Sequence, residues 1–579
     1  MALSTLSITE NLNAGQKEAV RKTAGPALVV AGPGTGKTLT IVNRIAHLIY
    51  QGVSPENILA VTFTNRAARE MRERIRALLC DISRRVFLGT FHLLGLRIIR
   101  ENATDGFEIY NREKQVKLLK PLLQGTRLKA DDIVDKISHV KGLALEPPDN
   151  LKAIYDEYRS TMHAKNALDF DDLILKPIEM FGDTELLKSY RERFRHIIID
   201  EYQDINPAQF RLLRLLSGNK ATICAVGDPD QAIYAFRGAD VENFLNFERN
   251  FTGVSRVTLD QNYRSSGNIV LSSNAMIMHN IKRIEKGLCA TKEEGSRIVV
   301  ASVPDERAEG EFVVHAIESR VGGLSHYRRS KAPCGNDFSD SSYCFSDFAV
   351  IFRTNNQAKA IEEALSDAGI PCRVLGRGHA TEGATQQDFA SSLKDYANRT
   401  DKGNNLFEMK AIEFLQCFAR ELSIESDQAT AFTDNIKLII GDAWAEATAG
   451  DIINELRLLA PADDYDPRAD VVTLMTLHMA KGLEFRVVFI SGVDDGLIPY
   501  KATKGSEDTE EERRLFYVGM TRARDELFLI HGRSRFRNGK MLIQPPSPFL
   551  CEIPEEYIWK ITIPDRAKKS NQKKQMKLF

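Results

Sequence analysis

The residues best suited to chemistry form a glycine-rich octet between an apolar run, ALVVA, and a stretch with apolar residues at helical spacing. In such a loop, backbone N–H groups curl around phosphate at a helix N-terminus, Lys37 reaches the β- and γ-phosphates, and Thr38 can ligate Mg²⁺. A bare octet of this kind also occurs by chance in turns, but the flanking strand and helix favour a nucleotide site. The octet is Ala31, Gly32, Pro33, Gly34, Thr35, Gly36, Lys37 and Thr38.

Two acidic residues, Asp200 and Glu201, follow the short apolar run HIII. A carboxylate at the end of a buried strand beside a phosphate-binding loop can hold Mg²⁺, and a second can polarise the attacking water. Taken alone, the pair is equally compatible with capping the helix that follows. Together with the octet, the pair is interpreted as Mg²⁺ binding by Asp200 and water activation by Glu201.

These side chains need rigid strands to position them. The chain supplies a series of short β-branched runs, each followed by a glycine or polar turn and a helical pattern. Strands that alternate with helices are typical of parallel sheets covered on both faces, so we predict an α/β fold with two doubly wound parallel sheets. The predicted strands are Ala27–Ala31, Ile58–Thr62, Ile197–Asp200, Ala221–Gly227, Ala349–Phe352, Val472–Thr476 and Val487–Ser491.

Other stretches of the chain differ in character. Residues 93–192 and 376–469 carry apolar residues at helical spacing and few strand signals, which predicts two helical insertions. Residues 321–346 are rich in Gly, Ser and Asp, which predicts a surface loop. Residues 566–577 contain six basic residues and no acidic one, which predicts a flexible tail.

Composition and charge exclude several classes of protein. The 579 residues are 43% hydrophobic and 27% charged, as in globular proteins with several cores. With 78 basic and 79 acidic residues, binding to nucleic acid must use local basic grooves. No apolar window approaches the roughly 18 residues that span a bilayer, and the first residues lack a signal-peptide pattern, so we expect no membrane partner and a cytoplasmic location. The eight scattered cysteines contain no C-x-x-C, which argues against a zinc ribbon.

A wider set of motifs, from about residue 10 to 530, resembles the UvrD/Rep/PcrA family of superfamily 1 helicases in order and spacing. The most specific are DEYQD from Asp200, VGDPDQAIY from Val226, FRGA from Phe236 and QNYRSS from Gln261. The others are TFTNRAA from Thr62, GTFH from Gly89, FRTN from Phe352, TLH from Thr476, KGLEF from Lys481 and YVGMTRA from Tyr517.

The resemblance implies two RecA-like motor domains with ATP in the cleft between them, each interrupted by a helical subdomain. The boundaries that follow are residues 1–92 and 193–275 for the first motor domain, 93–192 for its helical insertion, 276–375 and 470–560 for the second motor domain, 376–469 for its reduced helical insertion, and 561–579 for the basic tail.

For ATP, the resemblance implies that Gln16 reads the adenine edge, Tyr263 stacks on the base and Glu484 contacts the ribose. In the family one glutamine senses the γ-phosphate, and two arginines act as fingers in cis that neutralise charge during phosphoryl transfer. The residues assigned to catalysis are therefore Lys37, Asp200, Glu201, Gln231, Arg264 and Arg522.

For DNA, the resemblance implies aromatic side chains that stack on the bases of a single strand, with polar and phosphate contacts beside them. A single aromatic residue is more often part of a core, so only the motifs favour stacking here. The residues assigned to DNA are Phe63, Asn65, Thr90, His92, Tyr234, Phe236, Arg237, Asn355 and His478.

The chain departs from the family pattern at four places. Leu39 stands where relatives often have an arginine against the adenine, and Phe236 replaces the usual tryptophan. The segment from Arg533 to Gly539 should form the hairpin that separates strands in relatives, with Asn538 at the position of the aromatic pin and Phe536 nearby. The second helical insertion is shorter than in the best-known relatives.

The leading hypothesis is therefore an ATP- and Mg²⁺-dependent helicase that moves 3′ to 5′ on single-stranded DNA and unwinds tailed duplex DNA in repair, recombination or replication restart. One alternative is a translocase that strips proteins from single strands with little unwinding. Another is a nucleotide-gated DNA-binding recruitment factor, although such a switch does not need Glu201, Arg264 and Arg522 together.

The final residues resemble a Q-x-x-L-F peptide, which docks bacterial DNA enzymes on the replication sliding clamp. Gln575 would hydrogen-bond to the clamp, while Leu578 and Phe579 would fill an apolar pocket. A five-residue match is easily met by chance, and the Leu-Phe pair could instead pack on the second motor domain. We nevertheless expect weak clamp binding, because an apolar pair at the tip of a charged tail has no evident core to join. The preceding basic segment would then serve as a flexible tether.

Overall fold

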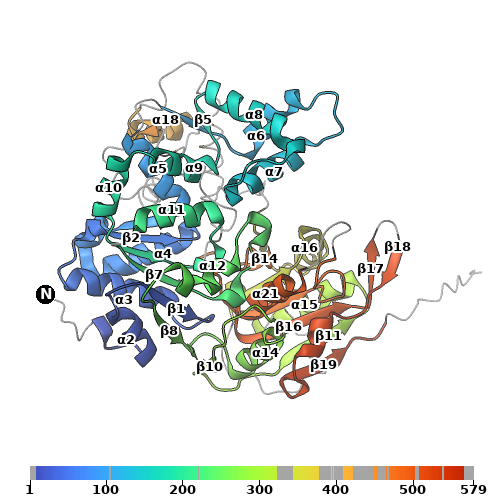
Figure 1. Cartoon of the computed structure of the whole chain (residues 1–579). Helices are drawn as coiled ribbons and strands as arrows, with labels where there is room; N and C mark the ends of the chain where they lie inside the picture. The colour runs from blue at the N-terminus through green and yellow to red at the C-terminus, as the bar shows by residue number, and fades with distance from the viewer. Residues whose placement is uncertain are drawn as a thin grey trace, which may run out of the picture. The chain divides into compact units, whose positions relative to one another are not determined.

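The computed structural model describes residues 8–102, 106–218, 221–321, 343–376, 409–421, 468–501, 508–537 and 540–565, with a few single positions between residues 393 and 465. The chain forms two compact units (Figure 1). The first comprises residues 1–262, 282–288 and 378–464, and the second comprises residues 263–281, 289–377 and 465–579. The chain therefore passes more than once from one unit to the other.

The first unit is built on a six-stranded sheet with the order β3-β2-β6-β7-β1-β8. Every neighbouring pair in this sheet is parallel. Because the strands are parallel, all their carboxyl ends lie along the same edge. The strands are β1 (Ala27–Ala31), β2 (Ile58–Thr62), β3 (Phe87–Thr90), β6 (His196–Ile199), β7 (Thr222–Gly227) and β8 (Ser255–Leu259).

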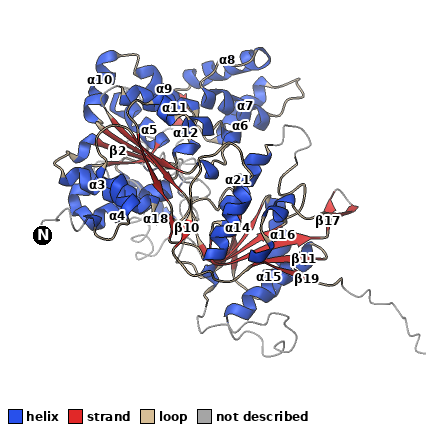
Figure 2. Ribbon diagram, turned by 60° about the horizontal axis from the view of Figure 1, so that its bottom comes forward, coloured by secondary structure: helices blue, strands red, loops and turns tan. Residues whose placement is uncertain are grey.

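Helices cover both faces of this sheet (Figure 2). The side chains of β1 alternate between the two faces, as strand geometry requires: Leu28 and Val30 join one core, and Val29 joins the other. The helices of the Val29 face are α2 (Ala14–Arg21), α3 (Lys37–Tyr50) and α4 (Asn65–Leu79). Those of the Leu28 face are α5 (Phe91–Asn102), α9 (Asp172–Met180), α10 (Thr184–Arg193), α11 (Pro207–Ser217), α12 (Val241–Leu245) and α13 (Phe247–Asn250).

Three helices within the predicted first insertion form a separate small core, whose buried members include Leu119, Ile137 and Tyr158. They are α6 (Arg112–Leu122), α7 (Ala130–Leu143) and α8 (Asp149–Ala164), and they lie beside a short parallel pair, β4 (Glu108–Ile109) and β5 (Ala167–Leu168). Lys141 of α7 is buried, and its Nζ lies 2.7 Å from a carboxylate oxygen of Asp169 and 2.7 Å from one of Asp172. Asp172 is the first residue of α9. This ion cluster joins the small helical core to the helix layer of the sheet.

The second unit is built on a seven-stranded sheet with the order β13-β14-β12-β15-β16-β11-β19, again with every pair parallel. Alternation again separates the faces: Val487 and Phe489 face a core with α15 (Glu306–Val321) and α16 (Ala358–Asp367), whereas Ile490 lies under Gly519 of α21 (Thr509–Met520). The strands are β11 (Ile298–Val303), β12 (Phe348–Phe352), β13 (Cys372–Val374), β14 (Val472–Thr476), β15 (Phe485–Ser491), β16 (Ala523–Gly532) and β19 (Ile558–Thr562). The helices are α14 (Gly267–Ile277), α15 (Glu306–Val321), α16 (Ala358–Asp367) and α21 (Thr509–Met520).

The predicted α/β fold with two large parallel sheets is confirmed, and each predicted strand is present within one or two residues of its expected bounds. The last strand, β19, runs to Thr562, because Ile561 packs on the core of the second sheet. The tail therefore begins after that strand. Within 376–469, the helix that the structure describes is α18 (Ala411–Glu421), and residues 378–464 group with the first unit. No helix in the described ranges is long and apolar enough to cross a membrane.

Candidate nucleotide and nucleic-acid sites

Most of the predicted functional residues of the first unit follow the carboxyl end of a strand in its sheet. The octet follows β1, Phe63 follows β2, His92 lies just after β3, and Asp200 follows β6. Side chains from strands that are far apart in sequence are brought to one edge because parallel strands all point the same way. In open α/β sheets this edge is where ligands bind.

The octet has the backbone of a phosphate-binding loop. Gly34 and Gly36 adopt φ angles of +69° and +82°, a region that strongly favours glycine. A Cβ at Gly36 would lie 2.6 Å from Nε2 of Gln16, so a side chain does not fit there without displacing that amide. Immediately afterwards α3 begins at Lys37, which leaves the first N–H groups of the helix directed at the loop.

Gln16 braces this loop. Its Nε2 donates to the carbonyl oxygen of Thr35 at 3.0 Å, and its Oε1 accepts from the backbone N–H of Asn13 at 3.0 Å. The Thr35 hydroxyl donates to the carbonyl of Gly32 at 2.8 Å, which closes the loop on itself. Gln16 thus lies beside the loop, as expected, and its amide already holds the loop in shape.

Glu201, one of the two carboxylates assigned to catalysis, lies next to the loop. Nζ of Lys37 is 3.4 Å from Oε1 of Glu201, and both side chains are less than one-fifth exposed. Glu201 adopts φ +50° and ψ +44°, an unusual left-handed conformation for a residue with a side chain. Asp200 is buried at the carboxyl end of β6. The structure therefore brings together the lysine and the two carboxylates that the sequence assigns to catalysis.

A hydrogen-bonded chain continues from Glu201 to Gln231. Nε2 of Gln203 donates to Oε2 of Glu201, and Oε1 of Gln203 accepts from the backbone N–H of Asp228 at 3.0 Å. Oδ2 of Asp228 accepts from Nε2 of Gln231 at 2.6 Å. Gln203 lies inside the DEYQD motif and Asp228 inside the VGDPDQAIY motif, but neither residue is assigned a role from residue type or motif. These contacts show that Gln203 holds the Glu201 carboxylate and that Asp228 holds the Gln231 amide.

The aromatic residues assigned to DNA form a ladder in the first unit. The rings of Phe63 and Tyr234 are stacked with centroids 4.6 Å apart, and the Phe236 ring lies 6.0 Å from Tyr234. The Arg237 guanidinium lies over both Tyr234 and Phe236, at 5.7 and 5.6 Å from the ring centroids. Phe236 is 59% exposed, which is far more than a core residue would be. Phe63 and Tyr234, for which core packing is the alternative, are half-buried and stacked on each other, whereas Phe236 is open to solvent.

Polar residues assigned to DNA lie at the same sheet edge. Thr90 is buried, and its Oγ1 accepts from the backbone N–H of Leu93, so this side chain caps α5. Burial and the nearby charge of Arg237 lower the pKa of His92 to about 4. Its imidazole is therefore neutral at pH 7 and can act as a hydrogen-bonding group, but not as a cation toward phosphate. Asn65 is the first residue of α4, two positions after Phe63.

The second unit carries its own cluster of charged residues. Nε of Arg264 lies 2.7 Å from Oε2 of Glu484, and its Nη1 donates to the carbonyl of Thr521 at 3.2 Å. Burial raises the pKa of Glu484, but the Arg264 guanidinium outweighs this and holds it below its usual value. Arg522 is almost fully buried and donates to the carbonyls of Val518 and Leu483. Arg264 keeps more exposed surface than Arg522.

Three further predicted residues belong to the second unit. Asn355 and His478 follow β12 and β14, which are neighbours in the sheet, so both lie at its carboxyl edge. Tyr263 is 44% exposed, which leaves its ring accessible to a planar ligand. Asn355 and His478 are thus the two of the nine residues assigned to DNA that belong to the second unit, and the other seven belong to the first.

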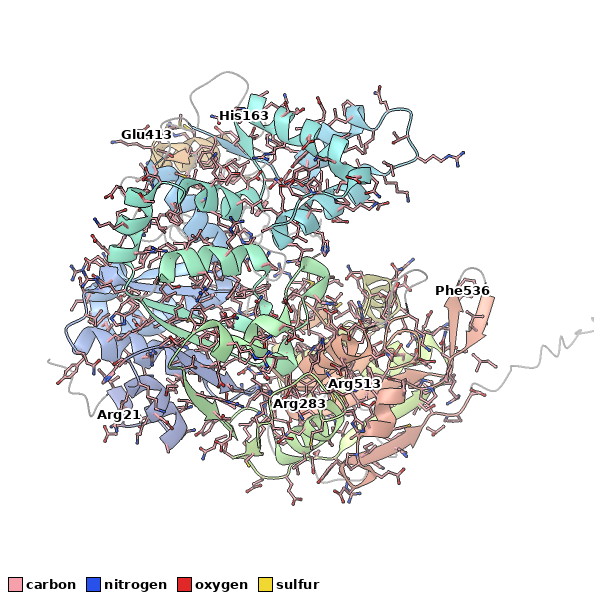
Figure 3. All side chains as sticks on the ribbon, in the orientation of Figure 1. Arg21, His163, Arg283, Glu413, Arg513 and Phe536 are labelled. Carbon is pink, nitrogen blue, oxygen red and sulfur yellow. The ribbon has the colours of Figure 1, made fainter. Side chains whose placement is uncertain are left out.

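The predicted hairpin is present as β17 (Ser534–Arg537) and β18 (Lys540–Ile543). Arg535 anchors it: the side chain is buried and pairs with Asp494 and Glu309. Phe536 faces Met541 across the hairpin, and both are more than half exposed (Figure 3). The predicted pin position, Asn538, lies outside the described residues, as do Gln575, Leu578 and Phe579.

The sequence of the chain was compared with protein families and with known proteins, and both comparisons find helicases. Residues 12–252 match the sequence profile of the UvrD/REP helicase N-terminal domain, and residues 257–402 and 386–534 match that of the UvrD-like helicase C-terminal domain. The chain is 32% identical to the ATP-dependent DNA helicase PcrA of Leuconostoc citreum over 96% of this chain and 86% of that protein. It is 32% identical to PcrA of Staphylococcus epidermidis, over 95% and 87% of the two chains, and 31% identical to PcrA of Staphylococcus aureus over the same shares.

Proposed function

The chain belongs to the UvrD/REP helicase family and is an ATP-dependent DNA helicase, and we propose that it moves 3′ to 5′ along single-stranded DNA. We further propose that it unwinds tailed duplexes during repair, recombination or replication restart. The observation that best supports a working motor is the continuous contact from Lys37 through Glu201 and Gln203 to Asp228 and Gln231. A protein that only clamps DNA would not need this arrangement.

In the proposed ATP site, N–H groups of the octet and the start of α3 bind the phosphates, and Lys37 neutralises their charge. Glu201 accepts a proton from the attacking water, while Gln231 contacts the γ-phosphate. Thr38 and Asp200 offer hard oxygen ligands that suit Mg²⁺, an ion that commonly completes its shell with water and phosphate oxygens. When bound, the ion would add charge neutralisation at the phosphates. No set of three or more His, Cys, Asp or Glu side chains gathers as a metal site within the described ranges.

On the DNA side, the ladder of Phe63, Tyr234 and the exposed Phe236 supports a role as a stacking platform, with Arg237 beside it to attract the DNA backbone. The ladder follows β2 and β7, the second of which also ends next to Asp228. A change at the nucleotide can therefore reach the DNA bases along a short stretch of chain, from Asp228 to Tyr234. This connection is what we propose couples hydrolysis to movement.

Strand displacement tests the proposed direction. With ATP and Mg²⁺, we expect release of the labelled strand from a duplex with a 3′ single-stranded tail, and little release from a 5′-tailed or blunt duplex. The Lys37→Ala variant is the control for hydrolysis-dependent release. Equal release from the 5′-tailed substrate would contradict the proposed direction.

The same assay can separate unwinding from protein stripping. In Phe536→Ala, the exposed ring of Phe536 is lost while the buried Arg535 anchor remains. We propose that this variant keeps DNA-stimulated ATP hydrolysis but displaces duplex more slowly.

We also propose docking on the sliding clamp through Gln575, Leu578 and Phe579, a proposal that rests on the sequence motif. A labelled peptide of about the last dozen residues should bind the host's clamp, since a Leu-Phe pair can fill an apolar pocket. The control is the peptide with Leu578→Ala and Phe579→Ala. Equal binding by both peptides, or binding by neither, would rule out this interaction.

A further inference from the structure

The short connector between α14 and β10 (Cys289–Ala290), residues 282–288, belongs to the first unit, although the residues on both sides of it belong to the second. The side chains of Arg283, Lys286 and Leu288 carry buried contacts to the nucleotide-binding unit. Figure 3 labels Arg283 on this connector. None of these residues lies in a motif that the sequence assigned to ATP or DNA.

The contacts of Lys286 and Arg283 are ionic and buried. Nζ of Lys286 pairs with Oδ1 of Asp228 and lies 3.0 Å from Oδ2 of Asp230, and Nη2 of Arg283 lies 2.8 Å from the same Asp230 oxygen. Lys286 is 1% exposed and both carboxylates are fully buried. Burial raises the pKa of Asp230, but the charges of Lys286 and Arg283 outweigh this and lower it. Two cations thus compensate two carboxylates away from water.

Asp228 connects this cluster to the nucleotide site. While its Oδ1 pairs with Lys286, its Oδ2 accepts from Nε2 of Gln231 at 2.6 Å. The backbone N–H of Asp230 also donates to Oδ1 of Asp228, at 3.1 Å, which fixes the plane of the carboxylate. The orientation of the Gln231 amide therefore depends on where Lys286 holds Asp228.

Leu288 makes a second contact with the site. The side chain is buried, and a Cβ built on Gly32 of the octet would lie 2.8 Å from its Cδ1. The connector thus touches the nucleotide site at two points, at the carboxylate that holds Gln231 and at the start of the phosphate-binding loop.

We propose that the connector 282–288 positions the ATP site, and that Lys286 is a positioning residue that acts through Asp228 on Gln231. This inference rests on the proposed role of Gln231 at the γ-phosphate. Lys286 touches neither ATP nor DNA in this proposal. Lys286 instead fixes the position of Gln231, which contacts ATP. Loss of Lys286 should therefore change kcat more than it changes the affinity for ATP.

The experiment is a double-mutant cycle between Lys286→Met and Gln231→Ala, measured as kcat and KM for ATP in the full-length protein with saturating single-stranded DNA. We expect Lys286→Met to lower kcat by about 10- to 100-fold, with KM changed by less than about threefold. In the Gln231→Ala background, the same change should lower kcat by less than about twofold, because the amide that it positions is absent. Lys282→Met is the matched control, because Lys282 lies on the same connector in an exposed pair with Glu242 and should leave kcat unchanged.

The outcomes separate the inference from the proposed function. An unchanged kcat in Lys286→Met, or an equal drop with and without Gln231, would overturn the inference. Near-normal kcat in Gln231→Ala alone would instead overturn the proposed role of Gln231, whatever Lys286 does. Should Lys286→Met lack a cooperative unfolding transition, Lys286→Arg takes its place. It keeps the buried charge but displaces the point of contact, so the same non-additive loss is expected, and wild-type kcat would overturn the inference.

Discussion

Glu201→Gln should lower the kcat of DNA-stimulated ATP hydrolysis by about 10²- to 10⁴-fold, the range expected when a general base is removed. The substitution keeps the size and hydrogen-bonding shape of the side chain but removes its ability to take a proton. Glu201 is well placed to act on water, because Lys37 lies 3.4 Å from one of its oxygens and Gln203 donates to the other. Its left-handed backbone is also an uncommon conformation for a residue with a side chain, and such conformations often occur at functional sites.

Binding should survive in this variant. Glu201 contacts Lys37 and Gln203 beside the octet, so we expect affinity for single-stranded DNA to stay within about threefold of wild type. The measurements are steady-state hydrolysis with and without DNA, and fluorescence anisotropy of a labelled oligonucleotide. Glu70→Gln is a matched control, because Glu70 makes an exposed ion pair with Arg74 on α4 of the same unit. Near-normal turnover in Glu201→Gln would contradict its assignment as the base.

Arg264→Lys should lower kcat by about 10³-fold or more, the loss typical of a missing arginine finger. Lysine keeps the positive charge but not the planar fork of N–H donors. In the structure that fork spans two partners, Glu484 at 2.7 Å and the carbonyl of Thr521 at 3.2 Å, which an ammonium group cannot hold in the same way. The guanidinium is also the more exposed of the two predicted fingers, since Arg522 donates to backbone carbonyls inside the protein.

The control for this prediction is Arg524→Lys. Arg524 lies 3.7 Å from the other oxygen of Glu484, but nearly half of its side chain is exposed. If the effect at Arg264 came only from losing a partner of Glu484, both variants would lose activity to a similar extent. A specific role in phosphoryl transfer predicts a large loss in Arg264→Lys alone, with ATP affinity changed much less than kcat. Similar, small losses in both variants would contradict the finger assignment.

The sequence by itself determined the fold class and the local parts of the ATP site. The octet, the strand before it and the helix after it are neighbours along the chain, so residue types alone predict their geometry. Glycine at positions 34 and 36 is a local requirement that the left-handed angles confirm. The parallel arrangement also followed from alternating strands and helices, and it placed the motif loops at one sheet edge.

Strands without a strong β-branched run, such as β3 and β16, were not predicted, because pairing with neighbouring strands, rather than local propensity, makes them part of a sheet.

Only the tertiary structure decided which side chains hold the functional residues in place. Lys286 and Asp228 are 58 positions apart, and Arg535 is 226 positions from Glu309, so no spacing rule links either pair. Each pair forms because a buried charge needs a partner, and the fold determines which partner is within reach. The exposure of Phe236 and the neutral state of His92 likewise depend on what packs around them. Motifs reveal the groups that meet the substrate because those groups cluster along the chain, whereas the residues that position them are chosen by folding.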